Sequence, residues 1–163
     1  MDMTRYRFRT LAPGDRPMTE RFFADLGEAA TGLFNVNRGN ERRVLEYFEN
    51  GKPDHRFFVT VDTQAATPTA AGLCFYWDLF SSVPWMGIAV ADAYRGQHLG
   101  SFTLDNLLQA LQNEGRGGVL LRTAQTNLPA QRLYESRGFE RLGVHASGEF
   151  LYIKRFPTEG TWN

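Results

Sequence analysis

Hydrophobic residues along this chain alternate between the period of strands and the period of helices. Short apolar or alternating runs predict strands over residues 6–11, 56–61, 71–80, 85–90, 119–123, 139–144 and 150–156. Apolar residues spaced three and four apart predict helices over residues 15–34, 40–50, 98–114 and 127–137. In the third of these helices the leucines share one face, namely Leu104, Leu107, Leu108 and Leu111.

The predicted elements follow one another as strand, two helices, three strands, helix, strand, helix and two strands. This order fits neither a β-sandwich nor a regular βαβ repeat, and it favours a mixed sheet flanked by helices. The predicted fold is therefore α/β of the α+β type, with a mixed, mostly antiparallel sheet of about six to seven strands and about four helices. We expect one domain over residues 1–156 and a flexible tail over residues 157–163.

The composition is that of an ordinary globular domain, with 163 residues of which 42% are hydrophobic. The 18 Lys and Arg balance the 18 Asp and Glu, which removes the electrostatic argument for a nucleic-acid or membrane partner. The single cysteine, Cys74, cannot form an internal disulfide, and no residue spacing suggests a metal site. Neither a leader-like start nor a bilayer-length apolar run is found, so the expected location is the cytoplasm.

Between the strand at 85–90 and the next helix lies a stretch with two glycines, Gly96 and Gly100. A strand that ends in such a turn and opens directly into a helix points backbone N–H groups, here from about Gln97 to Ser101, at one spot. The helix dipole adds positive potential there, so the spot suits a phosphate or pyrophosphate. Taken alone, these residues also fit a plain strand-to-helix turn.

A second strand-to-helix junction lies one helix further along, at residues 127–139. Because Leu133 and Tyr134 are adjacent, they face different ways on the helix, with Leu133 available for the core and Tyr134 pointing elsewhere. Taken alone, Asn127 is a cap or turn residue and Tyr134 an aromatic at a helix–sheet boundary. If the two strands are parallel neighbours, both helix N-termini meet at one sheet edge, where open α/β sheets bind ligands.

Together, the two junctions resemble the signatures of the GCN5-related N-acetyltransferases, the GNAT family. The first signature, Gln/Arg-x-x-Gly-x-Gly/Ala, is matched over residues 95–100, where His98 replaces the first motif glycine. The second, Asn-x-x-Ala-x-x-Leu-Tyr-x-x-x-Gly-Phe, is matched at Asn127, Ala130, Leu133, Tyr134, Gly138 and Phe139. With the order of elements, the resemblance covers residues 4–156.

The resemblance implies acetyl-CoA as the acyl donor. The pyrophosphate would bind the backbone of residues 97–101, and Asn127 and an open strand edge at residues 88–90 would bind the pantetheine arm. Tyr134 would act as general acid toward the leaving thiolate, and the N–H of Val90, or one close to it, would polarise the carbonyl. The full set implied to bind the cofactor is Ile88, Ala89, Val90, Arg95, Gly96, Gln97, His98, Leu99, Gly100, Ser101, Asn127, Ala130 and Tyr134.

The general base is the part of the chemistry that the sequence defines least. Many family members carry a Glu on the strand before the loop, whereas residues 85–90 contain no carboxylate. Asp78 is our first candidate, followed by Glu149 and His145, although each of them also fits a solvated surface residue. A water molecule could relay the proton.

The family's acceptor pocket usually lies between the first two helices and the central strands. Our candidate acceptor-binding residues are Phe34, Asn35, Trp77 and Trp85, with Asn37 and Phe75 beside them. Their aromatic character suggests an acceptor with an apolar part. The same rings could equally fill the core or a dimer interface.

The leading hypothesis is an acetyl-CoA-dependent N-acetyltransferase that acts on a primary amine of a small molecule or peptide by direct attack on the thioester. The missing carboxylate favours an alternative, a catalytically silent acyl-CoA-binding sensor or interaction domain. A third hypothesis is the transfer of a longer acyl group, or transfer to an oxygen acceptor. The resemblance also suggests a homodimer, because relatives are often dimers.

Overall fold

The computed structural model describes residues 3–34 and 39–157, with the side chains of residues 32–34 left out of this description. Within it, seven strands form a mixed sheet in the order β1-β2-β3-β4-β5-β7-β6. Neighbouring strands are antiparallel except β4 and β5, which are parallel. The strands are β1 (Tyr6–Thr10), β2 (His55–Asp62), β3 (Thr69–Trp77), β4 (Trp85–Val90), β5 (Gly118–Thr123), β6 (Glu140–Val144) and β7 (Phe150–Arg155).

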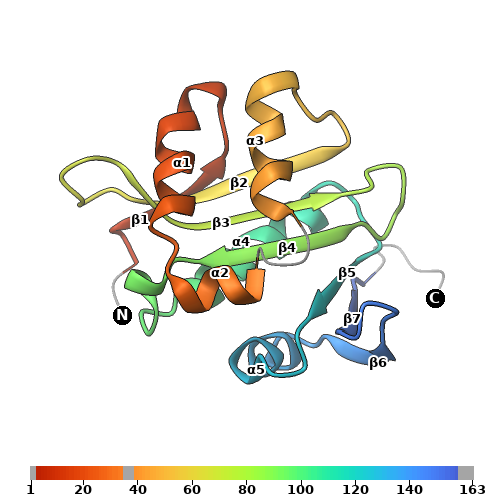
Figure 1. Ribbon diagram of the computed structural model, residues 1–163. Coiled ribbons are helices and arrows are strands. Elements are labelled where there is room, and N and C mark those ends of the chain that lie inside the picture. The colour runs from red at the N-terminus through yellow and green to blue at the C-terminus, as the bar shows by residue number, and fades with distance from the viewer. Residues whose placement is uncertain (1–2, 35–38, 158–163) are drawn as a thin grey trace.

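Helices cover both faces of this sheet (Figure 1). The α-helices are α1 (Arg16–Ala24), α2 (Glu28–Phe34), α3 (Asn40–Asn50), α4 (Leu99–Asn113) and α5 (Leu128–Ser136), with short 3-10 turns η1 (Pro13–Asp15) and η2 (Asp92–Tyr94). In Figure 1, α1 and α3 lie in front of the central strands and α4 lies behind them. The predicted α+β architecture is confirmed. Among the described residues, no helix has the length and apolar character needed to cross a membrane.

The single helix predicted over residues 15–34 is wrong, because the structure divides it into α1 and α2. Gly27 has φ 100°, a conformation that a helix cannot contain. The N-terminus of α2 is then capped from a distant segment, since the carboxylate of Asp92 accepts hydrogen bonds from the backbone N–H of Ala29 (3.3 Å) and Ala30 (3.2 Å). Asp92 therefore ties α2 to the turn that follows β4.

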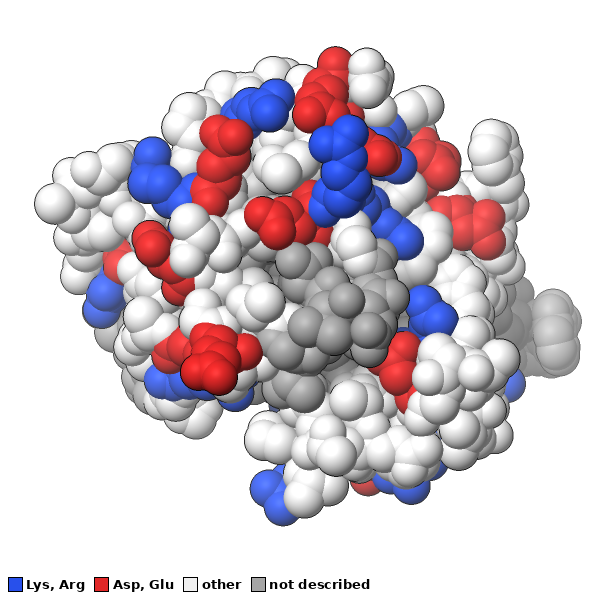
Figure 2. Space-filling model, viewed as in Figure 1, with Lys and Arg blue, Asp and Glu red and all other residues white. Residues whose placement is uncertain are grey.

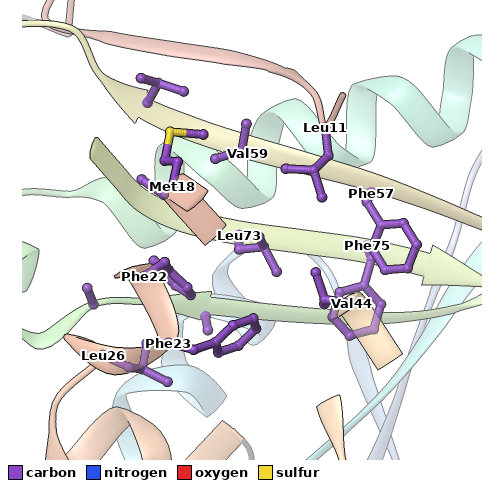
Figure 3. Close-up of a cluster of buried hydrophobic side chains, with 14 of the residues drawn as sticks. Leu11, Met18, Phe22, Phe23, Leu26, Val44, Phe57, Val59, Leu73 and Phe75 are labelled. Carbon is purple, nitrogen blue, oxygen red and sulfur yellow. The ribbon is translucent and has the colours of Figure 1, made fainter. Parts of the chain in front are cut away.

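Two apolar clusters fill the two sides of the sheet. The first lies under α1, α2 and α3 and is labelled in Figure 3 at Leu11, Met18, Phe22, Phe23, Leu26, Val44, Phe57, Val59, Leu73 and Phe75. The second includes Leu104, Leu107, Leu108 and Leu111 of α4, all 6% exposed or less, which confirms the face predicted from their spacing. Phe75 is fully buried in the first cluster, so it belongs to the core and not to an acceptor pocket.

The parallel strands β4 and β5 are paired at one position only, Trp85 opposite Leu120. Beyond that pair, β4 stays paired with β3 up to Val90, and β5 stays paired with β7 up to Thr123. The two strands consequently part toward their C-terminal ends, and Figure 1 shows β5 turned away from β4. This opening leaves the edge of β4 at residues 88–90 without a neighbouring strand, as the family resemblance implied, and it places the starts of α4 and α5 on either side of one gap.

On the face shown in Figure 2, basic and acidic side chains are interspersed and no large area carries one sign. Several of them pair along helices, as Arg42 does with Glu46 (3.5 Å) and Glu49 (3.0 Å) on α3. These exposed pairs each contribute little to stability, because water screens them.

Candidate active site

A cavity of about 380 Å³ fills the gap between β4 and β5. Its lining comes from β4, the loop into α4 and the first turn of that helix, β5, and α5 with the Asn127 that precedes it, together with one residue of α2. The residues are Ala30, Met86, Gly87, Ile88, Ala89, Val90, Tyr94, Arg95, Gly96, His98, Leu99, Gly100, Ser101, Leu121, Arg122, Thr123, Asn127, Pro129, Ala130, Leu133 and Tyr134. Every residue that the sequence implied for the cofactor lines this cavity except Gln97.

The loop before α4 presents unpaired backbone N–H groups to the cavity. His98 is the N-cap of α4 but its side chain makes no capping bond, so within the described residues the first N–H groups of the helix, from Leu99 to Ser101, have no side-chain cap. Gly96 has φ 76° and its Cα faces open space. An anion can therefore approach the backbone closely, and the helix dipole favours its charge.

His98 itself adopts the left-handed conformation, with φ 62° and ψ 20°. This conformation favours glycine and costs other residues about 1 kcal/mol. The departure of this sequence from the family signature thus lies at a position where the backbone would suit glycine. The loop keeps a conformation that opens onto the cavity, with some strain at His98.

Contacts with the first strand hold this loop in place. The hydroxyl of Tyr6 donates a 2.7 Å hydrogen bond to Oε1 of Gln97, which explains why the Gln97 side chain turns away from the cavity. The hydroxyl of Tyr94 donates to Asp62 (2.7 Å), and Arg5 donates to both oxygens of that carboxylate (2.9 and 2.7 Å). Burial and the bond to Asp62 raise the pKa of Tyr94 to about 12, so its hydroxyl stays protonated at neutral pH.

The edge of β4 that faces the cavity carries no strand partner beyond Trp85 in the described structure. Ile88, Ala89 and Val90 line the cavity along this edge. Their backbone N–H and C=O groups on the β5 side are available to an extended chain that carries amides, as a further strand would use them. The arrangement fits the pantetheine arm, which is extended and contains two amides.

Asn127 begins α5 at the other wall of the cavity. Its Oδ1 accepts a hydrogen bond from the backbone N–H of Ala130 (3.3 Å), which makes it the N-cap. The buried side chain of Gln131 donates to the carbonyls of Ala124 (3.2 Å) and Gln125 (3.0 Å), so the turn between β5 and α5 is fixed. Because the oxygen of Asn127 serves the cap, its Nδ2 is the group that can bind a ligand in the cavity.

Tyr134 lines the cavity while most of its ring is buried, 7% exposed, against Phe139 and Tyr152. The prediction that Tyr134 points away from the core is therefore wrong, whereas Leu133, which was expected to serve the core, does pack against it. Leu133 is the half-buried residue and also lines the cavity, whereas the ring of Tyr134 belongs to the core behind α5. Contacts with Phe139 and Tyr152 restrict the orientation of the Tyr134 ring.

Asp78 does not line the cavity. It follows β3 in an exposed turn, with φ 70°, and its carbonyl accepts from the N–H of Ser81. Nothing in this position supports a role as base, and the role stays a prediction. Cys74 is fully buried, and burial raises the pKa of its thiol, so it is no candidate nucleophile either.

Sequence reasoning missed Arg122, a charged residue of β5 that lines the cavity. Its guanidinium carbon lies 5.7 Å from the ring centre of Trp85 and its Nη1 lies 3.4 Å from Nδ1 of His145. Its Nε lies 4.0 Å from Oε1 of Glu149. The available signal was a lone arginine inside an apolar strand pattern. Glu149 and His145, the two further candidates for the general base, therefore both lie beside Arg122.

Of the four candidate acceptor residues, Trp77 and Trp85 come together. Their rings stack with centres 6.3 Å apart, although neither residue lines the cavity directly. The guanidinium of Arg43 covers the Trp77 ring at 4.1 Å. Asn35 lies outside the described residues, and Phe34 ends α2 with a side chain that is also outside them.

The comparisons with known proteins agree on one family. Residues 20–139 match the model of the acetyltransferase (GNAT) family. A GCN5-related N-acetyltransferase from Kribbella flavida is 19% identical with a TM-score of 0.74, over 95% of this chain and 100% of that one. A ribosomal-protein-S5-alanine acetyltransferase from Vibrio fischeri is 14% identical with a TM-score of 0.76, over 100% and 98%.

A PaiA N-acetyltransferase from Thermoplasma acidophilum, solved in complex with coenzyme A, is 13% identical with a TM-score of 0.73, over 96% of this chain and 100% of that one. At such identities the solved structures show a common fold, and the family itself rests on the match over most of the sequence. The chain belongs to the GNAT family of acetyltransferases, enzymes that take the acetyl group from acetyl-CoA.

Proposed function

We propose that this protein transfers an acetyl group from acetyl-CoA to a primary amine of a small molecule or peptide. The observation that carries the proposal is the convergence on one cavity of the free edge of β4, the start of α4 without a side-chain cap, and the residue Tyr134. The start of α4 suits the pyrophosphate of acetyl-CoA, and the edge of β4 suits the amides of its pantetheine arm. Tyr134 would donate a proton at the thioester. The amine would enter from the side of Arg122.

The backbone from Gln97 to Ser101 would hold the pyrophosphate, with Arg95 nearby at the exposed rim. Arg95 donates to Asp92 at 2.9 Å, so its charge stays beside the loop. The edge of β4 from Ile88 to Val90 and the Nδ2 of Asn127 would bind the pantetheine amides. Ala130 leaves room for the arm at the start of α5, because its side chain is a single methyl group.

Acetyl-CoA supplies the acetyl group as a thioester, and the transfer forms a C–N bond, breaks the C–S bond and releases the thiol. Tyr134 donates its hydroxyl proton to the departing sulfur, which makes the thiolate a better leaving group. The backbone N–H of Val90 donates to the carbonyl oxygen, where negative charge develops. The nitrogen loses one proton, and the phenol of Tyr134 regains one, so the protons balance.

The proton of the amine needs an acceptor. Asp78 keeps the role only as a sequence-based proposal, since it lies outside the cavity. Glu149 is better placed, because its carboxylate lies beside the cavity residue Arg122. His145 is poorly suited, since its Nδ1 already accepts from the N–H of Ser147 at 3.0 Å.

The proposal is tested with a charge placed at the start of α4. Ser101 is the third residue of this helix, where an acidic side chain favours the helix dipole but repels a bound pyrophosphate. Ser101→Asp should keep or raise the melting temperature of the free protein and weaken acetyl-CoA binding by roughly 10-fold or more in calorimetry. Ser101→Asn is the neutral control of similar shape, and it should bind acetyl-CoA nearly as wild type does.

Thiol release with a panel of amines and peptides separates the enzyme from a silent acyl-CoA-binding domain. Turnover that disappears in Ser101→Asp and persists in Ser101→Asn supports the proposal. Tight binding without thiol release from any amine would favour the sensor. If wild type and Ser101→Asp bind acetyl-CoA equally well, the pyrophosphate does not bind at the N-terminus of α4.

A further inference from the structure

We infer that Arg122 selects the acceptor, because its guanidinium binds a carboxylate carried by the acceptor amine. This inference rests on the proposed function, since it assigns a substrate class to the same cavity. The substrate class is an amine that also bears a carboxylate and an apolar part, as an amino acid does. The argument uses the position of Arg122, its weak pairing and the groups around it.

Arg122 lies in the opening between β4 and β5, two residues beyond Leu120, the residue of β5 that pairs with β4. Side chains alternate along a strand, and its neighbour Leu121 is buried with the leucines of α4. Arg122 therefore points to the opposite face, the one covered by α1 and α3. Its position over the ring of Trp85, which stacks on Trp77, agrees with that direction.

This placement puts Arg122 and Tyr134 on opposite faces of the sheet. The start of α4 and the phenol of Tyr134 belong to the side of the second apolar cluster, which packs against α4 and α5. Arg122 and Trp85 belong to the side of the first cluster, beside Trp77. A donor bound along β4 would thus meet an acceptor that arrives past Arg122.

The arginines that hold this fold together make close, two-pronged contacts with a carboxylate. Arg5 reaches Asp62 at 2.9 and 2.7 Å, and Arg9 reaches Asp15 at 2.7 and 3.0 Å. Arg137 reaches Asp105 at 2.8 and 3.1 Å. Such pairs satisfy both prongs of the guanidinium.

Arg122 differs from these structural arginines. Among the described residues its nearest carboxylate oxygen, on Glu149, is 4.0 Å away, and its hydrogen bond to His145 is long at 3.4 Å. Its side chain is nevertheless only 25% exposed. A partly desolvated guanidinium with long contacts, aimed into a cavity, is suited to a carboxylate that arrives with a ligand.

Hydrogen bonds within the turn before β7 hold the two neighbours of Arg122. Nδ1 of His145 accepts from the backbone N–H of Ser147 at 3.0 Å. Ser147 also donates through its hydroxyl to Oε1 of Glu149 at 3.1 Å. The turn before β7 therefore orients both neighbours of Arg122.

The same cluster accounts for the remaining parts of the substrate. Glu149 can attract the amine or receive its proton, while Arg122 binds the carboxylate, so a zwitterion finds both charges matched. The stacked rings of Trp77 and Trp85 offer apolar surface beside Arg122. A polyamine, which has only positive charge, would be repelled by Arg122.

The test compares each amino acid with its carboxamide, which keeps the amine and side chain but lacks the negative charge. Wild type should acetylate the acid about 10- to 100-fold more efficiently, in kcat/KM, than the amide. Arg122→Gln should lose this preference through a higher KM for the acid, with the amide hardly affected. Arg155→Gln is the matched control, because Arg155 lies at the other end of the β5–β7 pair and is 64% exposed, and it should keep the preference.

Other results would overturn the inference. If Arg122→Gln lowers kcat equally for acid and amide, Arg122 acts on the reacting carbonyl and not on a carboxylate of the acceptor. If wild type prefers amides or polyamines, the acceptor does not carry the proposed carboxylate. Binding of N-acetyl amino acids and of their amides, measured by calorimetry with CoA present, gives the same comparison without turnover. A failure of the proposed function would differ, since acetyl-CoA itself would then fail to bind or no amine would release thiol.

Discussion

The hydroxyl of Tyr94 donates a 2.7 Å hydrogen bond to Oδ2 of Asp62, a carboxylate that is 1% exposed. Tyr94 lines the cavity, whereas Asp62 ends β2 near the far edge of the sheet. The two hydrogen bonds from Arg5 hold the pKa of the Asp62 carboxyl well below its usual range. Asp62, paired with Arg5, thus fixes the loop before α4 to the first two strands.

Replacing Asp62 by Asn should lower the free energy of unfolding by about 1–3 kcal/mol at pH 7, because Arg5 loses its partner. A carboxyl with a depressed pKa stabilises the fold above its unfolded pKa of about 3.9 and loses that contribution as the pH falls further. Urea unfolding should therefore show a constant gap between wild type and variant from pH 5 to 8 that narrows below about pH 4. A gap that persisted unchanged to pH 2 would contradict this account. Asp105→Asn, at an exposed pair with Arg137, should cost less than about 1 kcal/mol.

Gly27→Ala should cost about 2–4 kcal/mol, since two effects act together. The residue has φ 100°, and an added Cβ would lie 2.2 Å from Oδ2 of Asp92. The side chain of Asp92 would have to move and would release the start of α2. Gly14→Ala is the control, because a Cβ there meets nothing within 4 Å, and it should change stability by less than about 0.5 kcal/mol. A thermal melt of both variants measures the difference.

His98→Gly should leave the protein as stable as wild type or up to about 1 kcal/mol more stable, because glycine adopts φ 62° without strain. His98→Val should lose about 1–2 kcal/mol, since a β-branched residue resists this conformation. Acetyl-CoA affinity of His98→Gly should stay within about 3-fold of wild type, because in the proposed complex the backbone holds the phosphates. A loss of about 10-fold would instead assign the contact to the imidazole.

The sequence predicted those parts of the molecule that local pattern determines. The spacing of Leu104, Leu107, Leu108 and Leu111 determines which face of α4 is buried, and the two signature segments identified the walls of the cavity. The division of the first long helix was not predictable in this way. It depends on Asp92, which is more than 60 residues away in the sequence and caps the N-terminus of α2.

Contacts between distant segments also decide the surroundings of Trp77, Asp78 and Arg122. Phe75 and Trp77 are alternate residues of one strand and look alike in sequence, but only Phe75 lies where helices cover the sheet completely. Asp78 was assigned to a strand, yet its positive φ ends β3 at Trp77 and leaves the carboxylate exposed. Arg122 gains its position only because β4 and β5 part, which is a property of strand pairing and not of β5 alone.

Tyr134→Phe is the prediction that decides the chemistry. A general acid acts mainly in the transition state, so the variant should lose about 100-fold in kcat, while KM for acetyl-CoA and the melting temperature change little. Tyr152→Phe is the matched control, because its ring lies 6.1 Å from that of Tyr134 but its hydroxyl donates to Glu135, outside the cavity. Thiol release at saturating acetyl-CoA measures both. An unchanged kcat in Tyr134→Phe would show that the thiolate leaves without this proton, and a similar loss in Tyr152→Phe would show that packing around α5, and not the phenol, limits the rate.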